Sequence, residues 1–366
     1  MMMLRALRPA LSSPSTRRWS SVAAHGARAT AASENTPSFG IAFDIDGVLI
    51  RCRRGIPHIF LTNGGGCLEA DKAANLGKIL DVAIDPAHMV LSHTPMRELV
   101  ERFADSRVLI MGSHDVYTVA ADYGFKKIVS VEDLARHHPE EYPFNTYDKK
   151  YVHCNIQVPR LSIQQLMCQC TLLYRVPAFH DEPIEAIIVM HDPTDWAPEL
   201  QIAVDVLIGG LPPGSGTVSG KQTPLFVSND DFIFSGAYPF PRFAQGAFTR
   251  CLRLLYEQLT GKELEITHYG KPHNVTYETP SFAEKKLNAI SSSTAPLRNI
   301  YGIGDNPHSD IQGANNAGAH WTSMLVRTGV YNGIEDPEHM PDVFIDSVID
   351  AIEHIYKTEG VDISDL

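Results

Sequence analysis

The sequence predicts an α/β protein built on a parallel sheet, with a second α/β segment inserted into it. Three short apolar runs favour this fold, each closed by small or polar residues: 41–43, 58–61 and 300–303. Such runs are typical of buried strands of a parallel sheet. Segments with helical spacing of apolar residues lie between them. With 366 residues, 44% hydrophobic and 20% charged, the chain is long enough for two domains with sizeable cores.

The first strand ends in paired carboxylates. The stretch 39–49 reads FGIAFDIDGVL, so Asp44 and Asp46 leave the strand end on the same side of an extended chain. Ligands of open α/β sheets bind outside the carboxyl ends of the strands. Two carboxylates this close suit Mg²⁺, with one acting as nucleophile and one as acid/base. The alternative interpretation is two solvated aspartates in a turn.

The second strand, predicted at 58–61, runs into Thr62-Asn63-Gly64-Gly65-Gly66. A hydroxyl and glycine-exposed backbone N–H groups ahead of a helix can hold a phosphate. The spacing predicts that helix over 67–81. A plain glycine-rich turn is the alternative.

An α/β insertion is predicted to follow. We expect a helix begun by Pro95, a helix ending near Gly124, strands at 107–111, 185–190 and 225–228, and helices at 200–207 and 244–259. The loop 214–222 only resembles a P-loop, because its spacing is one residue short. In the segment 232–243, Arg242 and several aromatic residues are candidates for an anion clamp and a hydrophobic wall. These aromatics could equally form the core of the insertion.

Two later segments bring further charged residues to strand ends. Lys271 follows a strand-like stretch at 263–272, where its ammonium could neutralise a phosphoryl group. Asp305 and Asp310 follow the strand predicted at the start of 299–319, and they could complete the oxygen ligands of Mg²⁺. A turn lysine and a helix-capping aspartate are the alternatives. A closing strand and helix are expected at 342–346 and 347–356.

The composition of the chain argues against several kinds of binding partner and site. The formal net charge is −12, which argues against nucleic acid as a partner. No stretch approaches ~18 uninterrupted apolar residues, so we expect no integral membrane segment. The cysteines lack zinc-ribbon spacing, and reduced thiols are favoured over a metal or redox pair at Cys168 and Cys170.

The first 33 residues differ from the rest. They hold five arginines, many serines and alanines, and no acidic residue before Glu34. This is the pattern of a mitochondrial transit peptide, so we assign 1–35 to a presequence and expect mitochondrial, matrix localisation. A disordered basic tail is the alternative.

Four motifs stand in a diagnostic order: DIDGV (44–48), LTN (61–63), GKP (270–272) and GDNPHSD (304–310). Together they resemble the haloacid dehalogenase (HAD) superfamily, in the NagD-like branch with a large α/β cap. Further details such as IFLTNGGG and HDPTDW are similar to the mitochondrial HAD-like hydrolase domain-containing 5 family, also called the cat-eye-syndrome critical-region protein 5 family. The resemblance implies a HAD-like Rossmannoid parallel sheet core at 36–92 and 265–366, with the cap domain at 93–264.

The resemblance also implies a chemistry: Mg²⁺-dependent phosphatase action on a small phosphorylated metabolite. Asp44 would form an aspartyl-phosphate, and Asp46 would serve as acid and base. Lys271 would orient and neutralise the phosphoryl group. The remaining expected roles are phosphate binding by Thr62, Asn63, Gly64 and Gly65, and Mg²⁺ ligation by Asp44, Asp46, Asp305 and Asp310. A link to glycerophospholipid metabolism is suggested, and a homo-oligomer is left open.

One departure from the family pattern favours a second hypothesis. Only residues 45–57 connect the first two strands, where the family has a complete helix. A parallel crossover usually needs a dozen residues or more and contains a helix. We therefore expect either a fold with an uncovered apolar patch on the sheet, or a catalytically impaired protein with a binding or scaffold role.

Overall fold

The computed structural model describes residues 37–45, 55–137, 182–209, 221–234, 238, 240–273, 282–291, 295–331 and 333–362. Residues 36–366 form one compact unit. The transit-peptide assignment, Asp46, and the pair Cys168 and Cys170 lie outside the described residues. None of the described helices is both long and apolar enough to cross a membrane.

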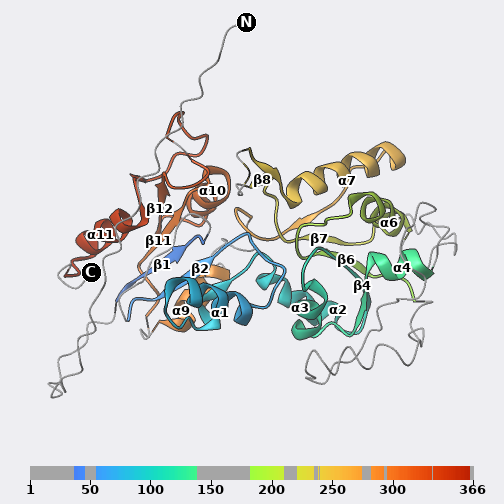
Figure 1. The fold of residues 1–366 in the computed structure, drawn as a ribbon, viewed down its shortest axis with the longest axis horizontal. Helices are drawn as coiled ribbons and strands as arrows, with labels where there is room; N and C mark the ends of the chain where they lie inside the picture. The colour runs from blue at the N-terminus through green and yellow to red at the C-terminus, as the bar shows by residue number, and fades with distance from the viewer. Residues whose placement is uncertain are drawn as a thin grey trace, which may run out of the picture. The chain divides into compact units, whose positions relative to one another are not determined.

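A parallel sheet forms the first part of the fold (Figure 1). Its strand order is β13-β12-β11-β1-β2-β3, and every neighbouring pair is parallel. In the pair of β1 and β11, Phe43 lies opposite Ile303, so both strands end at the same level. The strands are β1 Phe39–Phe43, β2 His58–Leu61, β3 Met89–Val90, β11 Asn299–Gly304, β12 Trp321–Val326 and β13 Val343–Ile345. The predicted strands at 58–61 and 299–304 are confirmed.

Helices cover both faces of this sheet. Successive strand residues point to opposite faces, so Ile41 and Phe43 pack with α1 (Glu69–Leu80) and α11 (Val348–Glu359). Ala42 packs on the other face with α9 (Phe282–Ile290) and α10 (Gln312–Asn316). All five residues of β1 are buried, so the expectation of an uncovered apolar patch at this strand is wrong. The neighbouring helices cover it despite the short connection.

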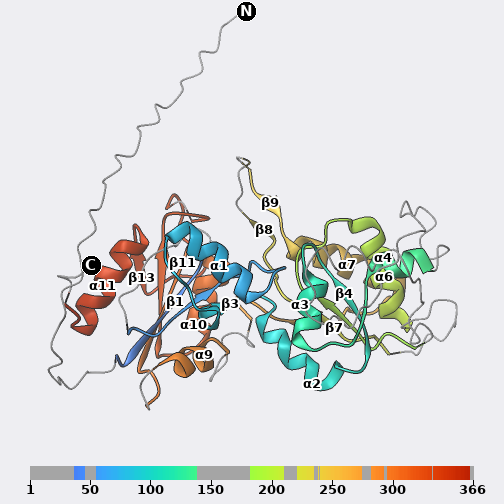
Figure 2. The same ribbon diagram turned by 60° about the horizontal axis from the view of Figure 1, so that its bottom comes forward.

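The inserted segment builds a second parallel sheet, of order β10-β7-β6-β4-β5 (Figure 2). The helices α2 (Val100–Phe103) and α3 (Val116–Tyr123) pack on one face, and α4 (Val131–His137), α6 (Trp196–Gly209) and α7 (Gln245–Thr260) pack on the other. Short helices η1 (Pro86–His88) and η2 (Thr94–Leu99) precede α2. The strands are β4 Arg107–Met111, β5 Lys127–Val129, β6 Ala186–Val189, β7 Leu225–Val227 and β10 Thr267–His268.

Strand β10 corrects one boundary predicted from the sequence. Residues from 265 onward were assigned to the core domain, but β10 pairs with β7 of the second sheet. Strand β10 consists only of Thr267 and His268, so no hydrophobic pattern indicates which sheet it joins. Lys271 therefore follows a strand of the second sheet rather than a strand of the first.

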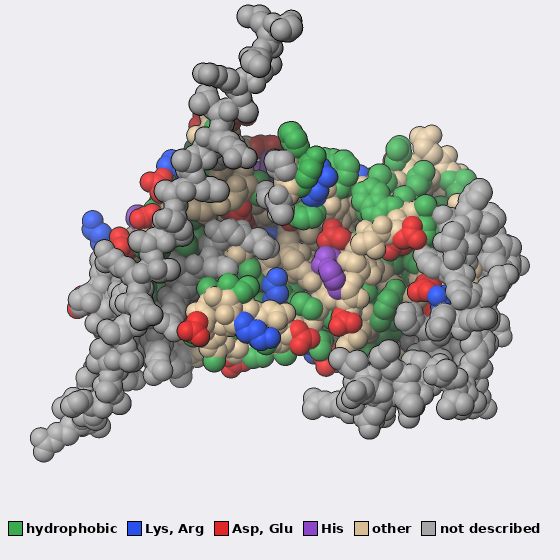
Figure 3. Space-filling view, in the orientation of Figure 1, with side chains coloured by type: hydrophobic (Ala, Val, Ile, Leu, Met, Phe, Trp, Pro, Cys, Tyr) green, Lys and Arg blue, Asp and Glu red, His purple; other side chains and the backbone are tan. Residues whose placement is uncertain are grey.

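A two-stranded antiparallel hairpin leaves the second sheet after β7. It is formed by β8 (Ile233–Phe234) and β9 (Arg242–Phe243). Its large apolar side chains are exposed, including Phe240 and Phe243 at 66% and 65%. Figure 3 shows hydrophobic side chains with a basic one among them in the region of β8. The aromatic residues of this segment are therefore surface residues, not core residues of the insertion.

Candidate active site

Three aspartates meet at the carboxyl ends of neighbouring strands. Asp44 directly follows β1, and its backbone N–H donates to the carbonyl of Ile303 at 2.9 Å. Asp305 directly follows β11, and Asp310 lies in the short helix η3 (Pro307–Ile311). The three carboxylates are buried, and one oxygen of each lies within 4.8 Å of the others. The first and fourth sequence motifs thus converge as predicted.

Lys271 brings a positive charge into this cluster. Its Nζ lies 2.7 Å from Oδ1 of Asp44 and 2.5 Å from Oδ1 of Asp310. Only 2% of the lysine is exposed, so water screens these ion pairs very little. The lysine ammonium is thus fixed between the carboxylates of Asp44 and Asp310.

The cluster carries more negative than positive charge. Burial raises the pKa of Asp44 well above its usual range, the Lys271 ammonium lowers it, and Asp310 and Asp305 raise it. Burial also raises the pKa of Asp305, followed by the effect of Asp310. Carboxylates that repel one another in a buried site favour a shared cation. Hard carboxylate oxygens are the ligands that Mg²⁺ prefers, so these residues fit that ion.

The side-chain amide of Asn63 bonds the backbone of Lys271, so Asn63 holds the lysine in position. Its Oδ1 accepts from the backbone N–H of Lys271 at 2.8 Å, and its Nδ2 donates to the carbonyl of Lys271 at 3.0 Å. The same Nδ2 donates to Oδ2 of Asp231 at 2.9 Å. A Cβ at Gly270 would lie 2.3 Å from the carbonyl oxygen of Ser228, so this approach of the chain requires glycine.

The loop after β2 is tightly held. Thr62 Oγ1 accepts from the backbone N–H of Gly64 at 3.0 Å, which forms a side-chain-stabilised turn. A Cβ at Gly65 would lie 2.8 Å from the ring of His93, a fully buried histidine whose pKa burial lowers to about 4. Thr62 is itself 2% exposed. Thr62, Gly64 and Gly65 were predicted, with Asn63, to bind phosphate. Their backbone conformation is constrained by the Thr62–Gly64 hydrogen bond and by the close approach of His93.

Sequence reasoning missed two groups of residues that shape the site. Gly304 and Gly329 leave room for the carboxylates: a Cβ would lie 2.2 Å from Cγ of Asp310 and 1.8 Å from Oδ2 of Asp305, respectively. The backbone N–H of Val330 donates to Oδ2 of Asp305 at 2.5 Å. Asp231, whose pKa burial raises to about 6, was also missed. The sequence signal that could have identified Asp231 is its place shortly after β7, because ligands bind at the carboxyl ends of parallel strands.

A cavity of about 810 Å³ lies beside the cluster. Pro272 and Asn306 line it and are adjacent in sequence to Lys271 and Asp305, and Asp231 lines it and accepts from Asn63, which bonds the backbone of Lys271. Further lining residues come from the hairpin base, α7 and α10: Phe232, Ile233, Arg250, Gln312 and Asn316. This volume suits a small organic ligand.

Arg242 does not join this site. It is exposed on β9, its guanidinium stacks 4.6 Å from the centre of the Tyr238 ring, and it does not line the cavity. The basic residue that does line the cavity is Arg250 on α7. The predicted hydrophobic wall is represented there by Phe232 and Ile233. Sequence alone could not indicate which side of the hairpin faces the ligand.

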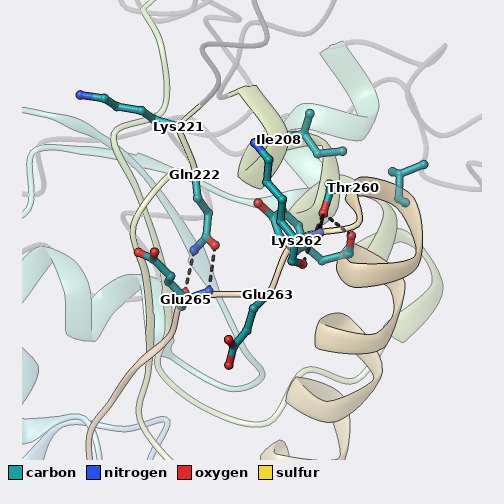
Figure 4. A pocket seen from close by; sticks show the side chains of 9 residues that line it. Ile208, Lys221, Gln222, Thr260, Lys262, Glu263 and Glu265 are labelled. Atoms are coloured by element: carbon teal, nitrogen blue, oxygen red, sulfur yellow. Dashed lines mark hydrogen bonds between the residues drawn. The ribbon is translucent and has the colours of Figure 1, made fainter.

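A separate cavity of about 1,030 Å³ lies on the second sheet's side of the chain (Figure 4). Its wall includes Gln222, whose side-chain amide donates to the carbonyl of Glu265 at 2.6 Å and accepts from its N–H at 2.9 Å. None of the predicted site residues lines it. We therefore place the chemistry at the aspartate cluster, where ionisable groups are concentrated.

A parallel sheet with an acidic cluster at its strand ends, and a second parallel sheet inserted in its chain, is the architecture that the four sequence motifs predicted. Family models agree: "haloacid dehalogenase-like hydrolase" matches residues 52–126 and "HAD-hydrolase-like" matches 268–351. A yeast protein of Saccharomyces cerevisiae, named mitochondrial hydrolase YKR070W, is 33% identical over 85% of this chain and 93% of its own length. The chain therefore belongs to the haloacid dehalogenase-like hydrolase family.

A second relative is a fusion protein. The Schizosaccharomyces pombe protein named cardiolipin synthase (CMP-forming) / mitochondrial hydrolase is 35% identical over 85% of this chain, which spans only 52% of that relative. Solved structures share the fold. One is a thermostable NPPase double mutant of Geobacillus stearothermophilus, with a TM-score of 0.55 and 16% sequence identity over 86% of this chain and 98% of that chain. Another is the 4-nitrophenylphosphatase of Thermotoga maritima, with a TM-score of 0.54 and 16% identity over 87% of this chain and 97% of that chain.

Proposed function

We propose that the chain is a Mg²⁺-dependent phosphatase that forms an aspartyl-phosphate on Asp44. The observation that carries this proposal is the position of Lys271, whose Nζ lies within 2.7 Å of Asp44 and 2.5 Å of Asp310. Phosphoryl transfer needs mainly positioned groups and charge neutralisation, and this buried cluster supplies both. The assembled cluster does not favour the idle binding or scaffold protein that the short connection suggested.

The proposed reaction has two displacements. An oxygen of Asp44 attacks phosphorus, the phosphorus–oxygen ester bond breaks, and the leaving alkoxide takes a proton from Asp46. Water then attacks the aspartyl-phosphate and gives its proton to Asp46, which releases inorganic phosphate and restores Asp44. Asp46 keeps the role implied by its place two residues after Asp44 in the sequence.

The remaining roles that we propose combine these contacts with the roles implied by the sequence motifs. Lys271 neutralises the phosphoryl oxygens while Asn63 holds its backbone. Thr62 and the backbone of Gly64 and Gly65 bind the phosphoryl group. Mg²⁺ would be held by Asp44, Asp46, Asp305 and Asp310, where it would neutralise charge on the transferring group.

The substrate proposed is a small phosphorylated metabolite with a polar glycerol-like body. The cavity beside the cluster supports this, because amide side chains of Asn306, Gln312 and Asn316 line it together with Phe232. The fusion of a relative to a cardiolipin synthase supports a link to glycerophospholipid metabolism. The names of both relatives support a mitochondrial location, which we propose is the matrix, reached by a presequence within 1–35.

The decisive experiment is a phosphatase screen with the full chain. The panel contains glycerol phosphates, phosphorylated lipid head groups and sugar phosphates, each measured with Mg²⁺ and with a chelator. We expect Mg²⁺-dependent phosphate release that the Asp44→Asn variant abolishes. Release that Asp44→Asn retains would contradict the proposal.

A further inference from the structure

A second group of potential metal ligands lies outside the aspartate cluster. Asp230 follows β7, His268 ends β10, and His273 follows Lys271 by two residues. One ligand atom of each lies within 4.8 Å of the others. None of them has a role in the proposed phosphatase reaction.

The two imidazoles have nitrogen atoms that no hydrogen bond satisfies. The rings stack with centres 4.6 Å apart at 24°. Within the described part of the chain, Nδ1 of His268 and Nε2 of His273 are buried atoms without a hydrogen-bond partner. Nε2 of His273 lies 3.7 Å from Oδ2 of Asp230, which is within ion-pair range but too long for a direct hydrogen bond. Buried polar atoms left unsatisfied are costly, and a shared cation would satisfy both nitrogens.

The carboxylate of Asp230 has a basic neighbour, Arg250. Its other oxygen, Oδ1 of Asp230, lies 3.5 Å from Nη1 of Arg250. The same guanidinium nitrogen donates to the carbonyl of Gly246 at 2.8 Å, which fixes the arginine. Outer groups that hold a ligand in place are a regular part of protein metal sites.

We propose that Asp230, His268 and His273 bind one divalent transition-metal ion such as Zn²⁺. Two imidazoles and one carboxylate suit borderline metals, whereas the all-oxygen cluster around Asp44 suits Mg²⁺. Metal–ligand distances of ~2.0–2.2 Å place neighbouring ligand atoms of a tetrahedral site roughly 3.4 Å apart, close to the distance between His273 and Asp230.

Three protein ligands leave a fourth position for water or an anionic oxygen. Asp230 and His273 both line the 810 Å³ cavity, so an ion held by them would lie at the wall of that cavity. The ion would then attract a second anionic or hydroxyl group of a ligand already bound there. Metal binding at this site does not depend on the proposed phosphatase function.

The test uses Co²⁺ as a spectroscopic probe with the full chain. The protein is stripped with a chelator, titrated with Co²⁺ and followed by visible absorption. We expect one equivalent with the intense bands of a four- or five-coordinate ion. His268→Gln and His273→Gln should each weaken binding at least ~10-fold, since each removes a ligand. Asp44→Asn should retain the same spectrum, because the aspartate cluster is a separate site.

His320→Gln is the matched control. Nε2 of His320 lies 3.3 Å from Oε2 of Glu284, which is a histidine–carboxylate pair without a second imidazole. This variant should bind Co²⁺ like the parent protein. If the histidine variants fail to fold by circular dichroism, X-ray absorption of the parent protein loaded with Zn²⁺ decides instead. Two imidazole ligands support the proposal, and an all-oxygen shell or the absence of stoichiometric binding overturns it.

Discussion

The side-chain amide of Asn63 holds the backbone of Lys271 through two hydrogen bonds, one accepted at 2.8 Å and one donated at 3.0 Å. The residue with the buried positive charge is thereby tied to the loop that follows β2. The lysine side chain reaches the carboxylates only from this backbone position. Asn63 is a positioning residue, and its loss should affect turnover more than substrate binding.

We expect Asn63→Ala to lower kcat by ~10–100-fold, with a smaller effect on KM. Two hydrogen bonds of about 1 kcal/mol each correspond to this range. Steady-state kinetics on the best substrate of the screen provides the measurement. Asn315→Ala is the control, since its exposed amide donates to the carbonyl of Met340, away from the aspartate cluster. Equal kinetics for both variants would show that the backbone clamp is dispensable.

Lys271→Met should be strongly destabilising without a divalent cation. It removes one partner from a buried ion-pair group, which typically costs ~3–5 kcal/mol. Denaturant unfolding should show this loss, and added Mg²⁺ should recover part of it by neutralising the same carboxylates.

The control for this variant is Lys126→Met. Its Nζ lies 2.8 Å from Asp105, but the two side chains are 58% and 81% exposed. An exposed pair contributes only ~0–1 kcal/mol. If Lys271→Met were as mild as Lys126→Met, or insensitive to Mg²⁺, the aspartates would not form a cation site.

Gly329→Ala should reduce Mg²⁺ affinity at least ~10-fold, as expected when a metal ligand is displaced. The new Cβ would lie 1.8 Å from Oδ2 of Asp305, so the carboxylate must move away. Val330→Ala keeps the backbone N–H that bonds Asp305 and should leave affinity near that of the parent. Isothermal titration with Mg²⁺ measures both. Unchanged affinity in Gly329→Ala would exclude Asp305 as a ligand.

Glu199 predicts a pH dependence of stability. Burial raises its pKa to about 7, although its Oε2 accepts from the backbone N–H of Asp195 at 2.8 Å. A raised carboxyl pKa favours folding at low pH, and that contribution is lost as pH rises from about 4.5 through about 7.

We therefore expect Glu199→Gln to gain ~1–3 kcal/mol over the parent protein between pH 5 and pH 8, using about 1.4 kcal/mol per pKa unit. The glutamine can still accept the bond from Asp195. Chemical unfolding at several pH values gives the measurement. Glu353→Gln, on the exposed face of α11, should show no such trend. A constant difference between parent and Glu199→Gln would contradict the burial argument.

Much of the fold was predictable because apolar runs and turn residues are local signals. The strand at 107–111 has the predicted bounds, and the helix expected to end near Gly124 ends there with φ +115°. Asp44, Lys271, Asp305 and Asp310 were named from the order of motifs and do converge. Their convergence follows from strand ends that share one edge of a parallel sheet.

Other features depend on contacts that no local pattern encodes. Arg250 on α7 lines the cavity and Arg242 on the β8–β9 hairpin does not, although both are basic residues near the same segment of the sequence. The grouping of Asp230 with His268 and His273 depends on β10 pairing with β7. Neither the pairing partner nor the side-chain direction can be predicted from a strand of two residues.

The edge position of β10 has a consequence for exchanging caps between related hydrolases. A chimera joined at 264 and 265, the boundary that the family resemblance implies, would separate β10 from β7 and leave the second sheet one strand short. A junction between Tyr269 and Gly270 transfers the whole second sheet and leaves Lys271 with the aspartates of the recipient. Hybrid enzymes built at that junction would combine the donor's side of the cavity wall, from Asp230 to Arg250, with the recipient's remaining lining residues and its ion cluster.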